Sequence, residues 1–200
     1  MSVHSETEAS EEARIAPLGV KLVVAGGFGV GKTTFVASIS EISPLTTEAA
    51  MTTESRGIDN VGSVNTKTTT TVAMDFGRIT IDPTLILYLF GTPGQDRFGF
   101  MWDDLIIGAV GSIVLVDTRR VDDCFAAVDY FESRDLPFIV AVNRFDGMLH
   151  HHLDEVRLAL DVSPDVPVIS TDARSRAEVK DALLVLLEHA LMRATSRIGA

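Results

Sequence analysis

The chain has 200 residues, which is enough for one well-buried domain and too short for two comfortable ones. Its formal net charge of −11 argues against a nucleic-acid-binding surface and against a basic patch for anionic lipid. The sequence contains no apolar stretch near the ~20 residues that span a bilayer, no secretion signal and no C-terminal prenylation cysteine. The charge and the lack of a long apolar stretch predict no nucleic-acid partner and no direct membrane insertion. The single cysteine, Cys124, cannot form an internal disulfide, so we expect a cytoplasmic protein.

Strand-like and helical segments alternate along the chain after a polar N-terminus. We expect a disordered acidic tail over residues 1–16, a single domain over residues 17–195 and a flexible C-terminus over residues 196–200. Apolar runs predict six strands, over Lys21–Ala25, Val72–Ile79, Leu85–Phe90, Ser112–Asp117, Phe138–Asn143 and Val166–Ser170. Helical spacing predicts helices over Lys32–Ser40, Asp96–Ile107, Asp122–Ser133, Leu153–Leu160 and Arg176–Arg193. This alternation predicts an α/β fold with a six-stranded, mostly parallel sheet and helices on both faces.

The segment between the first strand and the first helix reads Gly26-Gly27-Phe28-Gly29-Val30-Gly31-Lys32-Thr33. It matches the G-x-x-x-x-G-K-[ST] pattern of a phosphate-binding P-loop, in the order of strand, loop and helix that a P-loop requires. Glycines let the backbone approach a ligand closely, and successive N–H groups then form an anion nest at the helix N-terminus. We therefore expect residues 26–34, including Thr34, to bind a nucleoside phosphate, with Lys32 on the outer phosphates and the Thr33 hydroxyl on Mg²⁺.

A long segment between Glu41 and Thr70 interrupts the alternation. It has little periodicity and is rich in Thr, Ser, Gly and Glu. A loop of this length inside a compact domain is usually functional. We predict a mobile loop that orders over the nucleotide, and a disordered insertion is the alternative.

After the strand Leu85–Phe90 comes Gly91-Thr92-Pro93-Gly94-Gln95, and here the chain resembles the Ras-like small GTPases, whose third strand ends in D-x-x-G-Q. The resemblance implies a G domain in which the Gly94 N–H meets the γ-phosphate and Gln95 orients the attacking water. A neutral amide can serve, because phosphoryl transfer is catalysed largely by positioning and charge stabilisation. The metal-associated Asp of that motif is Gly91 here, which should weaken metal retention unless another group compensates. A surface Gly-Pro turn is the alternative.

The threonine-rich run from Thr66 to Phe76 resembles the end of switch I in the same family, T-x-G-x-[DE]-F. In that alignment Thr71 closes on Mg²⁺ and the γ-phosphate, although any of the four threonines at 68–71 can take this place. The alternative is that these β-branched residues only begin an edge strand.

A third motif, Asn143-Arg144-Phe145-Asp146, follows an apolar strand and resembles the guanine motif N-K-x-D. The Asp146 carboxylate would accept hydrogen bonds from the N1–H and 2-amino groups of guanine, which adenine cannot offer in that arrangement. The resemblance implies that Asn143 braces the P-loop and contacts the base, and that Arg144 covers the ring. Further on, the run Asp172-Ala173-Arg174 stands where the family carries S-A-K, so Ala173 would donate its backbone N–H to guanine O6.

Taken together, the motifs over residues 18–192 closely resemble the GTPases encoded in bacterial conservon operons, which are related to the gliding-motility GTPases. That resemblance implies a GTP-binding switch acting with a roadblock-type regulatory protein and a histidine-kinase-like membrane sensor complex. Such a complex would recruit the chain to the membrane periphery. The nucleotides would be GTP and GDP, with Mg²⁺.

Phe28 stands where fast GTPases usually have a small residue, and its ring should obstruct water alignment or the entry of an arginine finger. We therefore predict slow, partner-stimulated hydrolysis, signalled through residues 41–71 and 91–104. The sequence assigns no arginine to this task, and the candidates are Arg56, Arg97, Arg119 and Arg120. Two other classes stay open: a nucleotide-binding module with negligible hydrolysis, and a P-loop ATPase or small-molecule kinase.

Overall fold

A computed structural model of the chain describes residues 16–43, 45–52, 69–94 and 101–199. Its centre is one sheet with strand order β2-β3-β4-β1-β5-β6-β7. The strands are β1 (Leu18–Ala25), β2 (Leu45–Thr52), β3 (Thr69–Asp82), β4 (Leu85–Gly91), β5 (Ala109–Val116), β6 (Phe138–Asn143) and β7 (Val168–Thr171). Strands β4, β1, β5, β6 and β7 run parallel, whereas β3 is antiparallel to both of its neighbours. The predicted α/β fold with a mostly parallel sheet is confirmed.

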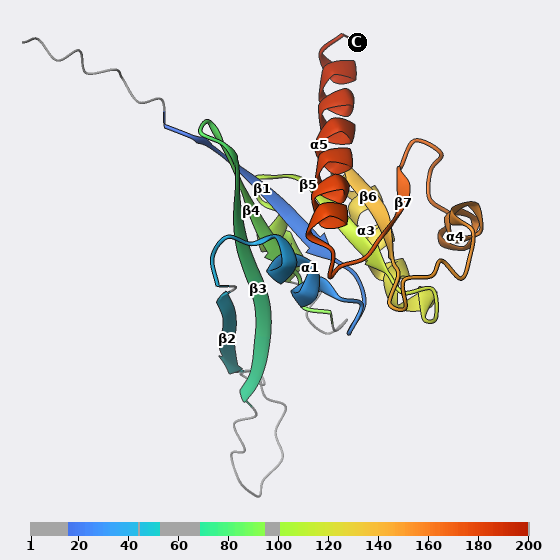
Figure 1. Ribbon diagram of the computed structural model, residues 1–200, viewed down its shortest axis with the longest axis horizontal. Coiled ribbons are helices and arrows are strands. Elements are labelled where there is room, and N and C mark those ends of the chain that lie inside the picture. The colour runs from blue at the N-terminus through green and yellow to red at the C-terminus, as the bar shows by residue number, and fades with distance from the viewer. Residues whose placement is uncertain (1–15, 44, 53–68, 95–100, 200) are drawn as a thin grey trace, which may run out of the picture.

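Helices cover both faces of this sheet (Figure 1). They are α1 (Lys32–Ile39), α2 (Trp102–Ile106), the 3₁₀ helix η2 (Val121–Cys124), α3 (Phe125–Ser133), α4 (Leu153–Leu160) and α5 (Arg176–Ile198). Along β1, Leu22 and Val24 pack in one core with α1 and α5, and Val23 and Ala25 pack in the other with α2, α3 and α4. A strand that is buried on both faces reads as a continuous apolar run, which is why the central strands were predictable.

The sheet has one more strand than predicted, because β2 lies inside the segment that we expected to be a loop. It pairs antiparallel with β3 from Leu45↔Phe76 to Thr52↔Thr69 and forms the edge of the sheet. Its sequence, LTTEAAMT, lacks the alternation of a strand, so pairing with β3 outweighs a weak local preference. In Figure 1 the β2–β3 pair extends past the rest of the sheet, at the edge opposite β7. The rest of the predicted loop, residues 53–68, lies outside the described residues.

Three helices differ by more than one residue from their expected bounds. Helix α3 begins at Phe125 rather than Asp122, because the 3₁₀ helix η2 precedes it. The helix predicted from Asp96 begins at Trp102, and residues 95–100 lie outside the described part of the chain. Helix α5 continues to Ile198, five residues past the expected end at Arg193. Among the described residues, no helix is long and apolar enough to cross a membrane.

The parallel strands place the functional motifs together. The parallel strands β1, β4, β5, β6 and β7 all end on the same side of the sheet. The loops that follow them therefore lie together at the carboxyl ends of the strands. The P-loop, Gly94 and the two candidate base motifs are in these loops. The fold therefore brings the motifs, which are far apart in sequence, to one site.

Candidate functional site

The P-loop is held by close backbone packing on its outer side. A Cβ added at Gly26 would lie 2.4 Å from the carbonyl oxygen of Leu115, and one added at Gly27 would lie 2.5 Å from the Cβ of Asp123. Gly31 caps α1 with φ 106, a conformation that L side chains rarely adopt. Contacts with the rest of the protein thus require glycine at positions 26 and 27, and the backbone conformation favours it at position 31.

Lys32 lies inside this loop. Its Nζ donates hydrogen bonds to the carbonyl oxygens of Gly26 at 2.8 Å and Gly27 at 2.7 Å, and the residue is buried. Burial lowers the pKa of the ammonium to about 8, and the charge of the nearby Asp75 offsets this only in part. A buried ammonium of this kind is suited to accept an anionic ligand, which would restore its preference for the charged form.

A cavity of about 310 Å³ opens on the inner side of the loop. One wall consists of Phe28, Gly29, Gly31, Lys32, Thr33 and Thr34, and the other of Asp75, Thr92 and Gly94. Gly94 fits closely, since an added Cβ would lie 2.5 Å from Lys32 Nζ and 2.9 Å from the carbonyl oxygen of Gly27. The structure thus places Gly94 at the P-loop, and its contact with a γ-phosphate stays a prediction.

The carboxylate of Asp75 lies beside Gly91, the residue that replaces the Asp of the D-x-x-G motif in this chain. Asp75 on β3 pairs with Gly91 on β4, and a Cβ at Gly91 would lie 3.0 Å from the Cβ of Asp75. The Oδ2 of Asp75 accepts a 2.7 Å hydrogen bond from the Thr33 hydroxyl. A carboxylate that the sequence did not assign to this place thus lies beside position 91, on the neighbouring strand.

The donor set around Asp75 fits a hard cation such as Mg²⁺. The Thr33 hydroxyl and the Asp75 carboxylate offer oxygen ligands, which this ion prefers. The buried hydroxyl of Thr92 lines the same cavity and has no hydrogen-bond partner among the described residues. A buried hydroxyl is normally paired, so its position is consistent with a polar ligand in this cavity.

Two of the residues predicted for this cavity are not among the described residues that line it. Gln95 lies outside the described residues, and its role stays a prediction. Thr71 lies on β3 opposite Ala50, four residues before Asp75 and so about 13 Å away along an extended strand. A role for Thr71 on Mg²⁺ therefore requires this end of β3 to rearrange.

We call the P-loop and the cavity that it lines the phosphate side of the site, and the loops after β6 and β7 the base side. Asn143 links the two sides. Its Nδ2 donates to the carbonyl oxygen of Val30 at 2.9 Å, and its Oδ1 accepts from the N–H of Ala173 at 3.0 Å. The side chain is buried. Asn143 therefore braces the P-loop, as expected, and it also holds the N–H that we expected on a guanine oxygen.

The base side contains two small cavities that share Asn143 and Phe145. One, of about 120 Å³, is also lined by Gly31, Thr34, Asp172, Ala173 and Arg174. The other, of about 10 Å³, includes Asp117, Arg119, Asp146 and His150. Asp146 thus lies in the second cavity, where its carboxylate is 3.9 Å from His150 Nε2 and its side chain is 71% exposed.

Charged pairs occupy the rest of the base side. Arg174 binds Asp172 through two hydrogen bonds, of 2.9 and 2.7 Å, and this contact lowers the pKa of Asp172 to about 2. The guanidinium of Arg144 pairs with Glu178, and Arg144 is not among the described residues that line either base-side cavity. Arg144 covering a base therefore stays a prediction, while Glu178 is a partner that the sequence did not reveal.

Phe145 and Arg119 form a second feature that sequence reasoning missed. The Arg119 guanidinium lies 4.3 Å from the centroid of the Phe145 ring and also binds Asp117 through Nε and Nη2. Those contacts lower the pKa of Asp117. The position of Phe145 inside the N-x-x-D motif was the only sequence signal for this ring.

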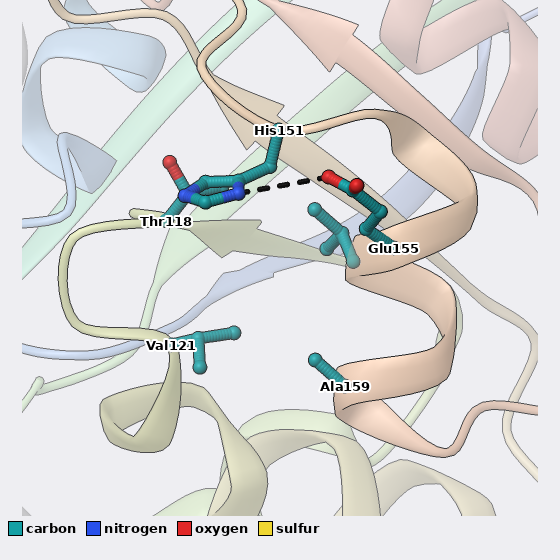
Figure 2. Close-up of a pocket in the computed structure, with 6 residues that line it drawn as sticks. Thr118, Val121, His151, Glu155 and Ala159 are labelled. Carbon is teal, nitrogen blue, oxygen red and sulfur yellow. Dashed lines mark ion pairs between the residues drawn. The ribbon is translucent and has the colours of Figure 1, made fainter.

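A further cavity lies outside the nucleotide motifs, behind the segment that follows β5. It measures about 270 Å³ and is mainly apolar. Figure 2 shows Val121 of η2 and Ala159 of α4 on two of its sides, with Thr118 near the ion pair between His151 and Glu155. Thr118 and Val121 flank Arg119 and Arg120, so this cavity backs onto the segment that carries both arginines.

Comparison with known proteins agrees with these features. The sequence profile of a family described as conserved hypothetical ATP-binding proteins matches residues 24–193. The uncharacterized protein MJ1339 of Methanocaldococcus jannaschii is 32% identical over 129 residues, which are 64% of this chain and 71% of that protein.

A solved structure gives a likeness of fold alone. The cytosolic domain of the T. maritima FeoB iron transporter, crystallised in apo form, superposes with a TM-score of 0.59 at 17% identity. The match covers 86% of this chain, and the chain spans 64% of the length of that structure. The fold, the P-loop and the profile together make this chain a nucleotide-binding P-loop NTPase.

Proposed function

The chain belongs to the family of conserved hypothetical ATP-binding proteins, and we propose that it is a switch that binds GTP and hydrolyses it slowly to GDP and phosphate. The observation that carries this proposal is the P-loop, which closes around Lys32 and is tied by Asn143 to the loop of Ala173. The loop would bind the phosphates, and the motifs Asn143–Asp146 and Asp172–Arg174 would bind the base.

Guanine is supported by the kinds of group on the base side. Asp146 carries a carboxylate, and the N–H of Ala173 is a donor beside Asn143. Adenine offers no pair of donors to a carboxylate in that arrangement, so an unpaired Asp146 would disfavour ATP. For guanine to engage, the N–H of Ala173 has to exchange its bond to Asn143 for one to the base.

Hydrolysis follows from positioning. The oxygen of a water molecule attacks the γ-phosphorus, the bond to the β,γ-bridging oxygen breaks, and the products are GDP, phosphate and a proton. Lys32 and the N–H of Gly94 would hold the γ-phosphate, and Gln95 would orient the water. Thr33 and Asp75 would hold Mg²⁺, which neutralises charge on the outer phosphates. Phe28 is 64% exposed at the cavity wall, where its ring would hinder the attacking water and keep turnover slow.

The partners belong to the same proposal. The sequence resemblance to conservon GTPases supports a roadblock-type protein that stimulates hydrolysis, and a histidine-kinase-like membrane sensor complex that recruits this cytoplasmic chain. Addition of a purified roadblock-type protein to the GTPase reaction tests this. We expect the single-turnover rate to increase, and an unchanged rate would remove this partner from the proposal.

Nucleotide competition tests the base preference. We expect GTP and GDP to displace a fluorescent guanine nucleotide, while ATP displaces it only at concentrations at least about tenfold higher, because one lost base contact costs about 1.4 kcal/mol. Asp146→Asn should reduce this preference without weakening the triphosphate contacts. An Asp146→Asn protein that still preferred guanine to the same degree would rule out our base assignment.

ATP is the second candidate, and it is favoured by the family description and by the exposed position of Asp146. The same competition decides between the two. If ATP and GTP displace the probe equally, the chain is a P-loop NTPase without the guanine preference. If ATP displaces it at lower concentration, the chain is an ATP-dependent protein.

A further inference from the structure

The segment after β5 lies directly against the outside of the P-loop. The Cβ of Asp123 is 2.5 Å from the place that a Cβ of Gly27 would take, and Nη2 of Arg120 is 3.5 Å from that of Gly29. Neither Arg120 nor Asp123 is among the described residues that line the phosphate cavity. They affect the loop without touching what it binds.

The two adjacent arginines of this segment act in different places. Arg119 lies over Phe145 on the base side. Arg120 instead reaches the P-loop, where its Nη2 donates a 2.8 Å hydrogen bond to the carbonyl oxygen of Phe28. Its guanidinium also lies 3.4 Å from the Asp123 carboxylate and 4.0 Å from that of Asp117. The rigid fork of an arginine can maintain these contacts together, which a lysine cannot.

The bond to Phe28 fixes the direction of one peptide unit. The peptide between Phe28 and Gly29 is trans, so its C=O and N–H point in opposite directions. Because Arg120 holds the carbonyl, the N–H of Gly29 is directed away from Arg120, and both Phe28 and Gly29 line the phosphate cavity. Glycine adopts either sign of φ with little cost, so without such a contact this peptide unit is free to turn over.

We propose that Arg120 is a positioning residue that holds the Phe28–Gly29 peptide with its N–H directed at the phosphates. The proposal rests on the proposed function only in that the P-loop binds a nucleoside di- or triphosphate, whatever its base. An anion nest depends on the orientation of each N–H, and fixing that orientation before binding lowers the cost of binding. Arg120 thus strengthens phosphate binding from outside the cavity.

Three variants and three measurements test this role. We expect Arg120→Ala to weaken GDP and GTP binding by about tenfold, which is about 1.4 kcal/mol, as the inward orientation is lost. Arg120→Lys keeps one charged donor for the Phe28 carbonyl and should recover part of this affinity. Arg134→Ala is the matched control, because Arg134 is also a surface arginine but pairs with Asp103 on the outside of α2. Both alanine variants should melt at temperatures within a few degrees of each other.

The amide signal of Gly29 gives a readout that a merely structural role would not move. In a ¹⁵N spectrum, addition of GDP should shift this signal strongly in the parent protein and in Arg134→Ala, and weakly in Arg120→Ala. Arg120→Ala binding GDP as tightly as the parent protein would overturn the proposal, as would an unchanged Gly29 shift. If the parent protein bound no nucleotide, the proposed function itself would fail, which is a different result.

Discussion

The phosphate side and the base side of the site are built in different ways. The phosphate side consists of backbone packed against backbone, with glycines where no side chain fits and with Lys32 buried inside the loop. The base side consists of partly exposed side chains that bind each other, as Arg174 binds Asp172 and Arg144 binds Glu178. The first is a formed receptor for an anion, and the second has to exchange partners to receive a base.

This difference explains why one side contributes affinity for any nucleotide and the other contributes selectivity for the base. All nucleoside triphosphates carry the same phosphates, so a rigid backbone nest gives affinity without selecting the base. Selection depends on unpaired donors and acceptors at the base edge. On this side the N–H of Ala173 and the carboxylate of Asp172 already have partners within the protein. We therefore expect variants on the phosphate side to have large effects on all nucleotides, and variants on the base side to have small, selective ones.

The largest expected effect comes from Lys32→Met, which replaces the buried ammonium with an uncharged chain of similar length. The charge-assisted bonds to phosphate are lost, so affinity for GTP, GDP and ATP should fall by about 100-fold or more. Titration of a fluorescent nucleotide measures this. Lys180→Met, at an exposed site on α5, is the control and should bind normally. A loss limited to guanine nucleotides would contradict the contrast between the two sides.

Asp75→Asn should have the next largest effect, and it is specific to the metal. The amide can still accept the Thr33 hydrogen bond but carries no charge, so Mg²⁺-dependent affinity should fall by about tenfold. Metal-free GDP binding should change little. The measurement is nucleotide affinity as a function of Mg²⁺ concentration.

A paired exchange makes the test of Asp75 sharper. Gly91→Asp alone would crowd the Cβ and Oδ2 of Asp75, at 3.0 and 3.1 Å, and should destabilise the protein. Asp75→Ala combined with Gly91→Asp moves the carboxylate to the neighbouring strand and should recover part of the Mg²⁺ dependence. If Asp75→Asn left that dependence unchanged, Asp75 would not replace the missing carboxylate.

The sequence predicted what depends on local pattern. The P-loop and the continuous apolar strands β1, β5 and β6 follow from glycine spacing and from burial on both faces. Strand β2 was missed because its pairing with β3 gives it a structure that its own residues do not indicate. Asp75 was missed because the register of β3 against β4, which no local pattern reveals, places it beside Gly91. Arg144 takes the lysine position of its motif, yet Glu178, distant in sequence, is its partner.

The pH dependence of binding is the third prediction. Burial lowers the pKa of Lys32 to about 8, so the ammonium is charged below pH 8 and is neutral above it. A bound phosphate favours the charged form, and binding above pH 8 therefore has to take up a proton. Affinity should fall by about fivefold between pH 8 and 9 and change little between pH 6 and 7. Calorimetry in two buffers would detect the proton uptake at pH 8.5, and its absence would show that Lys32 is charged throughout.

The smallest expected effect belongs to the base side, at Glu178→Gln. The Oε2 of Glu178 accepts from Arg144 and, at 2.9 Å, from the N–H of Asp172. A glutamine oxygen keeps the N–H contact but loses the charge. The pair with Arg144 is partly exposed, so its loss should cost at most about 1 kcal/mol and lower the melting temperature by about 2–4 °C.

The effect of Glu178→Gln on binding should be selective. With its partner neutral, Arg144 is freer to reach the base, and the ratio of GTP to ATP affinity should change by about twofold while pyrophosphate binding stays constant. Glu188→Gln, an exposed change on the same helix, is the control and should alter neither. A change in pyrophosphate affinity as large as that in GTP affinity would mean that the two sides are mechanically coupled through α5. The division between a rigid phosphate receptor and an adaptable base side would then have to be abandoned.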